Sequence, residues 1–230
     1  MLQGKLASIL ITHLYMYIMT TFPAHRAANS LVVFDFETTG LSPDLGDRSI
    51  EIGAVLIEEG VITRRFQQLM NPGIRIPLFI ENLTGITNAM VRQSRSNSEV
   101  MAEFFSFIDG HNLVAHNASF DERFLRAEFK RIKKSFTGGI ACSLLASRRI
   151  FQQAPNHQLA TLVEYKNLPN EGVFHRALAD AEITAHLWLG LLAELQERHQ
   201  LDMPSFAFMA NLCKTPRHQL AKLLARANAG

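Results

Sequence analysis

Cysteine is scarce in this chain. Only Cys142 and Cys213 occur among its 230 residues, and they lack the spacing of a metal site or of a redox pair. A disulfide framework of the kind that stabilises small secreted proteins is therefore not expected. We expect both thiols to be buried as small apolar side chains in a protein of the reducing cytoplasm.

Long apolar runs are also lacking. Residues 6–19 are mostly apolar, but the run is too short to cross a bilayer, is broken by polar residues and has no small-residue cleavage site. We therefore predict no membrane contact. Residues 1–30 are treated as an N-terminal tail, either appended to the fold or preceding a true translation start at Met16 or Met19. The mass of the native protein tests the second alternative, which an intact Met1 would refute.

A strong excess of one charge is absent too, since the formal net charge is +2 and 47% of the residues are hydrophobic. No internal repeat or low-complexity stretch is visible. This composition predicts one α/β domain with a substantial core, which we place at residues 31–200. Residues 201–230 are set apart as a basic helical extension, because Pro216 is followed by leucines at helical spacing. This helix could pack on the domain, contact a partner or touch nucleic acid.

The first of three acidic motifs spans residues 34–40 and reads FDFETTG. It continues an apolar run that predicts a buried strand at residues 31–36. Because side chains alternate along a strand, Asp35 and Glu37 point to the same face. Two adjacent carboxylates repel each other and are costly to desolvate, so a divalent cation is their natural partner. The alternative is an ordinary strand end whose acids lie in solvent.

The second motif, HNASFD at residues 116–121, lies at the start of a helix that apolar spacing predicts over residues 118–133. Asn117 or Ser119 is expected to cap this helix. Asp121 then lies in the first turn, where the helix dipole favours a carboxylate even without a function. A short buried strand precedes the motif, so Asp121 projects from a strand-to-helix junction, a common place for active-site groups in α/β folds.

The third motif, HRALADA, spans residues 175–181. On one continuous helix, His175 and Asp180 would point about 140° apart. The loop-like residues 168–172 instead place His175 before a helix expected at residues 176–197, so that both side chains can face one site. A lone histidine in this position is more often a surface residue, but this one shares its segment with a carboxylate that the two other motifs can join.

Together the motifs supply four carboxylates and one histidine. Asp35, Glu37, Asp121 and Asp180 can hold two divalent ions about 3.5–4 Å apart, the arrangement used for in-line displacement at phosphorus. We assign the first two and Asp180 to the ion on the nucleophile side, and Asp35 with Asp121 to the ion at the leaving 3′ oxygen. Mg²⁺ fits best, because it takes few carboxylates and completes its shell with water and phosphate. His175 is the candidate general base. The chain is therefore predicted to be a metal-dependent nuclease.

The three motifs also resemble those of the DEDDh 3′–5′ exonucleases, and most of all the proofreading (epsilon) subunit of bacterial DNA polymerase III and its stand-alone relatives. IEIGAV at residues 50–55 and LTGIT at residues 83–87 match as well, and the resemblance covers about residues 31–198. It implies a ribonuclease H-like, mixed five-stranded sheet flanked by helices, and two Mg²⁺ or Mn²⁺ ions. It also implies release of nucleoside monophosphates from DNA 3′ ends in replication proofreading or repair.

The resemblance implies a substrate pocket as well. Thr38, Thr39 and Gly40 would seat the terminal nucleotide, with Leu83 and His116 nearby. Thr84 stands where the epsilon subunit has histidine, which favours a stand-alone relative or another polymerase-linked branch.

All five catalytic positions are filled, so activity is expected. The expected partner is a nucleic acid 3′ end, preferably in single-stranded DNA, and a DNA polymerase is the candidate protein partner. The same chemistry on RNA, or a non-catalytic nucleic-acid-binding module, are the alternatives.

The pattern along the chain predicts three antiparallel strands at residues 31–36, 48–57 and 61–70, the last two joined in a hairpin, and then strand–helix units. This order predicts an α/β fold with a mixed sheet and helices on both faces.

Six basic residues cluster on and after the predicted helix at residues 118–133: Arg123, Arg126, Lys130, Arg131, Lys133 and Lys134. They either follow nucleic acid phosphates or form a solvated face. His157 is expected to pack or cap rather than to bind a metal.

Overall fold

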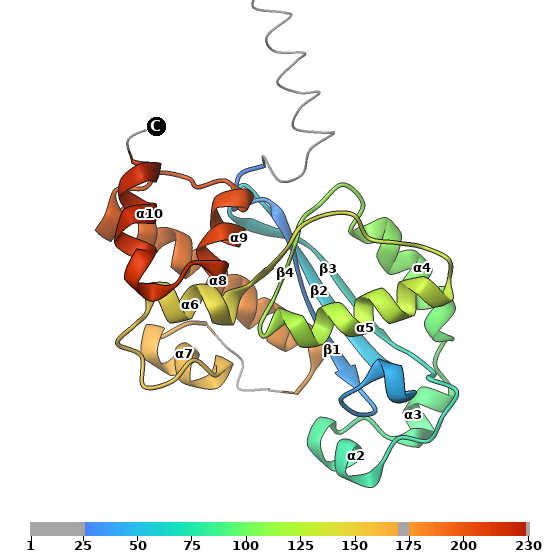
Figure 1. Cartoon of the computed structure of the whole chain (residues 1–230). Helices are drawn as coiled ribbons and strands as arrows, with labels where there is room; N and C mark the ends of the chain where they lie inside the picture. Colours follow the sequence, from blue (N-terminus) through green and yellow to red (C-terminus); the bar gives the residue numbers. More distant parts are fainter. Residues whose placement is uncertain (1–25, 170–174, 229–230) are drawn as a thin grey trace, which may run out of the picture.

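The computed structural model describes residues 26–169 and 175–228. They form a five-stranded sheet in the order β3-β2-β1-β4-β5 with helices on both faces (Figure 1). β1 (Leu31–Thr38), β2 (Ser49–Glu58) and β3 (Val61–Leu69) are antiparallel, and β4 (Leu113–Ala115) and β5 (Ile140–Cys142) continue the sheet in parallel. The predicted mixed sheet is confirmed.

The predicted hairpin between β2 and β3 is also confirmed. Glu59 and Gly60 have φ angles of 50° and 84°, so both central residues of the turn are left-handed. A two-residue turn of this kind matches the right-handed twist of the two strands that it joins.

The helices expected at residues 118–133, at residues 176–197 and after Pro216 are all present among the helices of the structure. Those in the sheet region are η2 (Pro43–Leu45), α2 (Leu78–Thr84), α3 (Asn88–Arg92), α4 (Asn97–Phe107), α5 (Ala118–Arg131), α6 (Ser143–Ile150), α7 (Leu159–Lys166) and α8 (Ala177–His199). They are followed by α9 (Phe206–Lys214), η3 (Arg217–Gln219) and α10 (Leu220–Ala227). The sequence analysis missed α2 and α9.

Side chains of β1 alternate between two buried layers. Val32, Phe34 and Phe36 pack under α4 and α5, where Phe104 lies 6.2 Å from the Phe34 ring. Leu31 and Val33 enter the layer under α8 on the opposite face. Asp35 and Glu37 continue this second series, so the alternation directs both acids toward α8.

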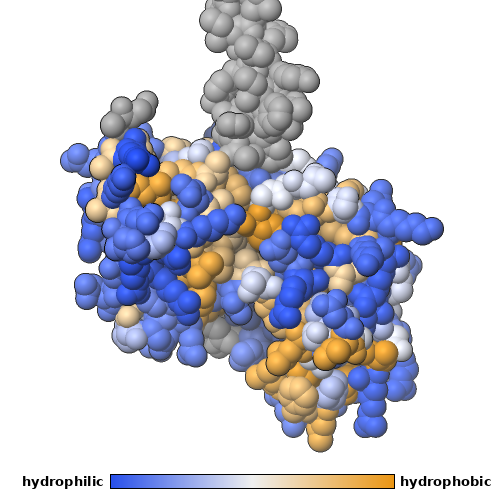
Figure 2. Space-filling view, in the orientation of Figure 1, coloured by the Kyte–Doolittle hydropathy of each residue, from blue (hydrophilic) through white to orange (hydrophobic). Residues whose placement is uncertain are grey.

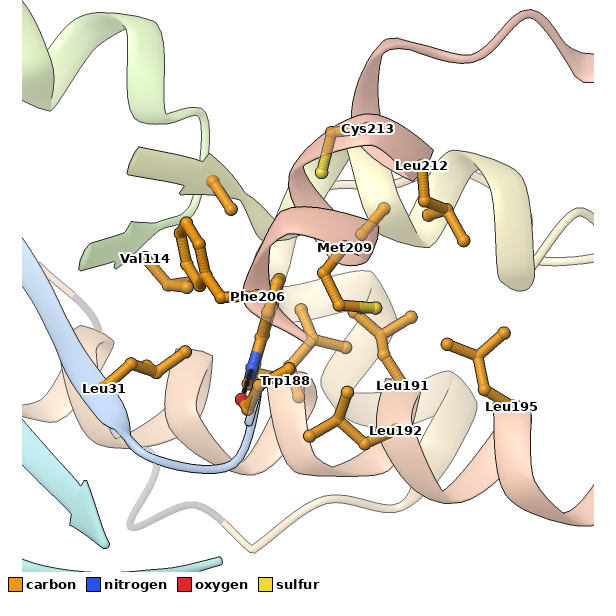
Figure 3. Close-up of a cluster of buried hydrophobic side chains, with 14 of the residues drawn as sticks. Leu31, Val114, Trp188, Leu191, Leu192, Leu195, Phe206, Met209, Leu212 and Cys213 are labelled. Atoms are coloured by element: carbon orange, nitrogen blue, oxygen red, sulfur yellow. Dashed lines mark hydrogen bonds between the residues drawn. The ribbon is translucent and has the colours of Figure 1, made fainter. Parts of the chain in front are cut away.

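The second layer extends into the C-terminal helices. Trp188 of α8 packs with Phe206 and Met209 of α9 (Figure 3), and its indole N–H donates a 2.7 Å hydrogen bond to the carbonyl of Ala28. Residues 26–30, which the sequence assigned to the tail, pair in part with the segment before α9, through a bridge from Ala27 to Ser205. The rest of the tail lies outside the described residues.

Two further expectations concern the cysteines and the membrane. Cys142 and Cys213 are both free and buried, as predicted. Among the helices of the described residues, none combines the length and apolar character needed to cross a bilayer.

Candidate active site

The C-terminal part of β1 presents two acids on one face. Asp35 pairs with Gly53 and Glu37 with Glu51 across the β1–β2 ladder. Phe34 and Phe36 point to the opposite layer. The predicted common orientation of Asp35 and Glu37 is confirmed.

Gly53 lets the start of α8 cross directly over this point of the sheet. A Cβ atom at residue 53 would lie 2.0 Å from the backbone nitrogen of Leu178 and 2.1 Å from the carbonyl carbon of Ala177. No side chain other than hydrogen fits such an approach. Because Gly53 pairs with Asp35, the first turn of α8 is placed beside Asp35.

Asp180 lies in that first turn and completes a group of three acids. Carboxylate oxygens of Asp35, Glu37 and Asp180 all lie within 4.8 Å of one another. The Oδ2 atom of Asp180 accepts a 2.9 Å hydrogen bond from the backbone N–H of His175. This bond fixes the carboxylate against the segment that precedes α8.

Asp121 reaches β1 from the other side of the sheet. It lies in the first turn of α5, is 2% exposed, and its Oδ1 accepts a 3.1 Å hydrogen bond from the backbone N–H of Phe36. It therefore adjoins the three acids without being one of that compact group. The predicted side-chain cap of α5 is wrong: Asn117 occupies the N-cap position at φ 67°, but no cap hydrogen bond is made by its side chain.

The four carboxyl groups disturb one another strongly. Burial, together with the charges of Asp121, Asp180 and Glu37, holds the pKa of Asp35 well above its ordinary value. Burial and then the charge of Asp180 raise the pKa of Glu37 to about 8, and burial raises that of Asp121 to about 7. Burial also raises the pKa of Asp180, although the hydrogen bond from His175 lowers it in part.

A divalent cation fits this donor set. Like charges at such distances favour protonation unless a positive charge compensates them. The ligands are all hard carboxylate oxygens, which suit Mg²⁺ or a similar ion. Asp35, Glu37 and Asp180 are the residues positioned to hold one such ion, with Asp121 adjoining Asp35.

His175 lies just before α8, as predicted. The helix begins at Ala177, and His175 has a left-handed φ of 62°. Its side chain is exposed, and its imidazole lies close enough to Asp180 to lower the pKa of that carboxyl. The backbone N–H holds Asp180, so the imidazole itself remains available for proton transfer.

Comparison with known proteins identifies the family. The family model described as Exonuclease (RNase T) matches residues 32–188. The chain belongs to the RNase T family of DEDDh 3′–5′ exonucleases. This family consists of metal-dependent phosphodiesterases, and the acidic cluster of this chain is consistent with their metal site.

Three curated relatives are similar to this chain. The DNA polymerase III subunit epsilon of Aquifex aeolicus is 35% identical over 167 residues, which cover 72% of this chain and 82% of that protein. The PolC-type DNA polymerase III of Caldanaerobacter subterraneus is 41% identical over 72% of this chain but only 12% of its own length. The 3′–5′ exonuclease DinG of Bacillus subtilis is 38% identical over 84% of this chain and 20% of its own length. The chain thus spans a small part of the two longer relatives.

Solved structures agree on the ribonuclease H-like fold. Exonuclease X in complex with 5′ overhanging duplex DNA superposes with a TM-score of 0.63 at 25% identity, covering 80% of this chain and 99% of that one. The nuclease domain of 3′hExo, a DEDDh family member bound to rAMP, has a TM-score of 0.62 at 20% identity, covering 72% of this chain and 92% of that one. The predicted ribonuclease H-like fold is confirmed.

Glu51 is a member of the site that the sequence analysis did not single out. It is fully buried and accepts hydrogen bonds from the guanidinium of Arg176 at 2.9 and 3.2 Å, from the Ala177 N–H at 3.1 Å and from the Gln67 amide at 2.9 Å. The available signal was a single charge inside the apolar strand at residues 50–57. A buried carboxylate needs several donors, and here they come mainly from the start of α8.

The threonine side chains of the predicted nucleotide pocket form hydrogen bonds with other residues of the protein. Thr38 is buried and its hydroxyl donates to the carbonyl of Gly40 at 2.6 Å. The hydroxyl of Thr39 donates to Asp47 at 3.2 Å and accepts from the Arg48 N–H at 3.0 Å. A Cβ at Gly40 would lie 2.5 Å from the Asp47 carboxylate. The Asp47 carboxylate thus organises the loop after β1, and contact with a nucleotide would fall mainly to the backbone.

Leu83 and His116, the other two predicted pocket residues, differ in exposure. Leu83 is 51% exposed on α2, beside the exposed Leu78 and Phe79. Figure 2 shows a hydrophobic surface over this lobe. Thr84, which stands at the divergent position, is buried and donates to the carbonyl of Ile80 at 2.9 Å.

His116 is held by the protein through both ring nitrogens. Its Nε2 lies 3.0 Å from the carbonyl of His157, and its Nδ1 lies 2.8 Å from the hydroxyl of Ser143. Burial lowers the pKa of His116 to about 4, so the ring is neutral and must donate from Nε2 and accept at Nδ1. The Nε2 atom of His157 lies 3.1 Å from the carbonyl oxygen of Phe151, and His157 is not part of the acidic group.

Proposed function

We propose that this exonuclease removes nucleotides from DNA 3′ ends, single-stranded or frayed, and releases nucleoside monophosphates in replication proofreading or repair. The observation that carries the proposal is the convergence of Asp35, Glu37 and Asp180 within 4.8 Å, with Asp121 and His175 adjoining them. Relatives named as a DNA polymerase III subunit epsilon and as a PolC-type DNA polymerase III support DNA as the substrate. The buried free thiols fit work in the cytoplasm.

The carboxylates would hold two Mg²⁺ or Mn²⁺ ions. Asp35, Glu37 and Asp180 form the nucleophile-side site, and Asp35 with Asp121 the leaving-group site. When bound, such ions polarise the phosphate and promote ionisation of water. Asp180 accepts a hydrogen bond from the backbone N–H of His175, and Asp121 accepts one from the backbone N–H of Phe36. Each bond uses one carboxylate oxygen, so the second oxygen of each carboxylate takes no part in it. Each of these two acids is thus oriented by the backbone before any ion binds.

His175 would accept the proton of the attacking water. The water oxygen forms a new bond to the terminal phosphorus, and the bond from phosphorus to the 3′ oxygen of the preceding nucleotide breaks. The released 3′ oxygen takes up a proton from solvent, so the shortened strand ends in a 3′ hydroxyl, and the terminal nucleotide leaves with its 5′ phosphate. The left-handed backbone at His175 turns the chain immediately before α8, which keeps the imidazole next to Asp180.

A degradation time course tests the proposal. Single-stranded DNA and RNA of matched sequence, labelled at the 5′ end, are incubated with Mg²⁺, with EDTA, and with the Asp35→Ala variant. We expect a metal-dependent ladder that shortens from the 3′ end on DNA and is lost in the variant. Faster cleavage of RNA would move the substrate class to RNA. Failure of the folded, Mg²⁺-supplied protein to cut either strand would overturn the enzymatic proposal in favour of a binding role.

The resemblance to polymerase subunits motivates a proposed protein partner as well. A DNA polymerase would supply this exonuclease with mismatched 3′ ends. Co-elution of the purified chain with the replicative polymerase of its own cell, measured by size-exclusion chromatography, tests this. Separate elution at micromolar concentrations would favour a stand-alone enzyme.

A further inference from the structure

A basic groove runs along α5 beside the loop that follows β1. It has a volume of about 610 Å³ and is lined on one side by Arg123, Arg126, Lys130 and Arg131, and on the other by Pro43 and Asp44 of η2. We call it the α5–η2 groove. All four of its basic residues are exposed. Figure 2 shows hydrophilic side chains over α5 next to the hydrophobic surface of the α2 lobe.

Much of the positive charge in the groove is not neutralised by the protein. Among the described residues, Arg123 and Lys130 form no ion pair; Arg123 donates to the carbonyl of Ser119 at 3.3 Å and lies over the Phe120 ring at 5.9 Å. Arg126 pairs with Glu122 at 2.7 Å.

Arg131 keeps much of its charge as well. It lies 3.6 Å from Glu128, but that carboxylate is already bound by Arg48 through two hydrogen bonds of 2.9 and 3.1 Å. Asp44 is the acid that lines the groove itself. The lining therefore carries a net positive charge, which a dianionic or polyanionic ligand would compensate.

The groove lies on the helix that carries Asp121 and beside the loop that follows β1. Asp121 lies in the first turn of α5, and the helix rises about 1.5 Å per residue, so the cations from Arg123 to Arg131 lie roughly 3–15 Å along the axis from Asp121. Arg123 and Lys130 are seven residues apart and share one helix face. The opposite wall, η2, belongs to the same loop as Thr39 and Gly40. Arg123 and Lys130 point about 160–180° away from Asp121 around the helix. A strand whose end lies at the carboxylates would therefore enter the groove across the loop after β1, not along the buried face of α5.

We propose that the α5–η2 groove binds consecutive backbone phosphates of the nucleic acid whose 3′ end is being cut. The inference rests on the proposed function and adds the surface that holds the substrate next to the cleavage site. The phosphates could belong to the strand being degraded or to its complement in a duplex, since both offer the same chemistry. Contacts of this kind carry no sequence preference and depend strongly on salt.

The experiment measures how DNA binding depends on salt. The double variant Arg123→Gln/Lys130→Gln removes the two cations without an ion pair. The control, Lys222→Gln/Arg226→Gln, removes two exposed cations from α10, which lies away from η2 in Figure 1. All proteins also carry Asp35→Ala so that DNA is not cut. Fluorescence anisotropy gives the affinity for a single-stranded oligonucleotide and for a duplex at several salt concentrations.

We expect the slope of log affinity against log salt to fall in the groove variant and to stay unchanged in the control. The expected decrease is about 1.4 on single strands if the degraded strand lies in the groove. If the complementary strand lies in the groove, we expect the slope to decrease by about 1.8 on the duplex and to stay unchanged on single strands. Unchanged slopes on both ligands, or an equal decrease in the control, would overturn the inference.

A second assay separates this inference from the proposed function. The same double variants, with Asp35 restored, are given the p-nitrophenyl ester of thymidine 5′-monophosphate, which has no neighbouring phosphate. We expect the groove variant to hydrolyse it at the wild-type rate. Wild-type protein that does not hydrolyse the ester would count against the proposed function. The slopes of log affinity against log salt would still decide whether the groove binds phosphates.

Discussion

The carboxylate of Glu51 and the guanidinium of Arg176 form a two-bond ion pair, at 2.9 and 3.2 Å, that joins β2 to the residue before α8. Glu51 is paired across the sheet with Glu37, a member of the candidate metal site, and Arg176 follows His175 directly. Arg176 also lowers the pKa of Glu37, against the larger effects of burial and of neighbouring acids that raise it. One buried carboxylate thus fixes the start of the helix that carries Asp180.

Replacing Glu51 by Gln should therefore damage both stability and activity. The substitution leaves Arg176 and the Ala177 N–H facing an amide that can no longer accept all their hydrogen bonds, and we expect a loss of about 1–3 kcal/mol in the free energy of unfolding. Activity per folded molecule should fall as well, because Asp180 is no longer held in place. Urea denaturation and the DNA degradation assay measure the two effects.

The matched control is Glu182→Gln on α8, the helix whose start Glu51 holds. Glu182 pairs with Arg65 on the surface, where both side chains are partly exposed, so the change should cost less than about 1 kcal/mol. Equal losses of stability in the two variants would contradict the assigned importance of Glu51.

Gly53→Ala should be far more disruptive than its single methyl group suggests. The new Cβ would lie 2.0 Å from the backbone of α8, so the helix must move away from β2 and carry Asp180 away from Asp35. We expect unfolding or a folded protein without Mg²⁺-dependent cleavage, measured by circular dichroism and by the degradation assay.

Gly190→Ala is the control for this substitution. Gly190 lies within α8, and among the described residues a Cβ there would meet only Leu168, at an ordinary 3.9 Å. Alanine within a helix is favoured over glycine by about 0.5–1 kcal/mol, so stability should be kept or rise. If Gly53→Ala were as active as Gly190→Ala, the close crossing of α8 over β2 would not be required.

Much of the fold could be predicted because it follows from local patterns. The alternation along residues 31–37 gave the orientation of Asp35 and Glu37, and the loop before residue 176 gave the break between His175 and α8. The placement of Asp121 in a first turn was equally local. These features depend on the periodicity of strands and helices, which a single sequence carries.

The features that were missed depend on tertiary contacts. α9 was not predicted because its apolar residues, such as Phe206 and Met209, are explained by packing on Trp188 rather than by a local signal. The role of Glu51 arises mainly from donors at Arg176 and Ala177, more than 100 residues away in the sequence. Asn117 was expected to cap α5, but it adopts a left-handed conformation in which no side-chain cap bond is made. Local propensity gives no account of such long-range geometry.

His175→Asn should reduce catalysis without disturbing the site. The bond that holds Asp180 comes from the backbone N–H, so it survives the substitution, and asparagine tolerates the left-handed conformation of residue 175. Loss of a general base typically lowers the rate about 10²–10⁴-fold. We expect a decrease in kcat of that order, with the melting temperature and its increase on adding Mg²⁺ unchanged. A variant that retained full kcat would exclude His175 as the base.

The raised carboxyl pKa values predict how pH and divalent ions act together on stability. In metal-free protein, folding raises the pKa of Glu37 from 4.5 to about 8 and that of Asp121 from 3.8 to about 7, so the folded state binds more protons than the unfolded chain. The contribution of these groups to stability is therefore present below about pH 4 and is lost as pH rises toward 8.

Divalent ions should reverse that loss, because they compete with protons for the same oxygens. We expect Mg²⁺ to raise the melting temperature more at about pH 8 than at about pH 5.5, measured by differential scanning fluorimetry against EDTA. The Asp35→Asn/Glu37→Gln variant removes two of the charges and should lose most of this pH dependence. Equal Mg²⁺-induced shifts at both pH values in the wild-type protein would show that the cluster does not bind the ion, because binding there must displace protons at the lower pH.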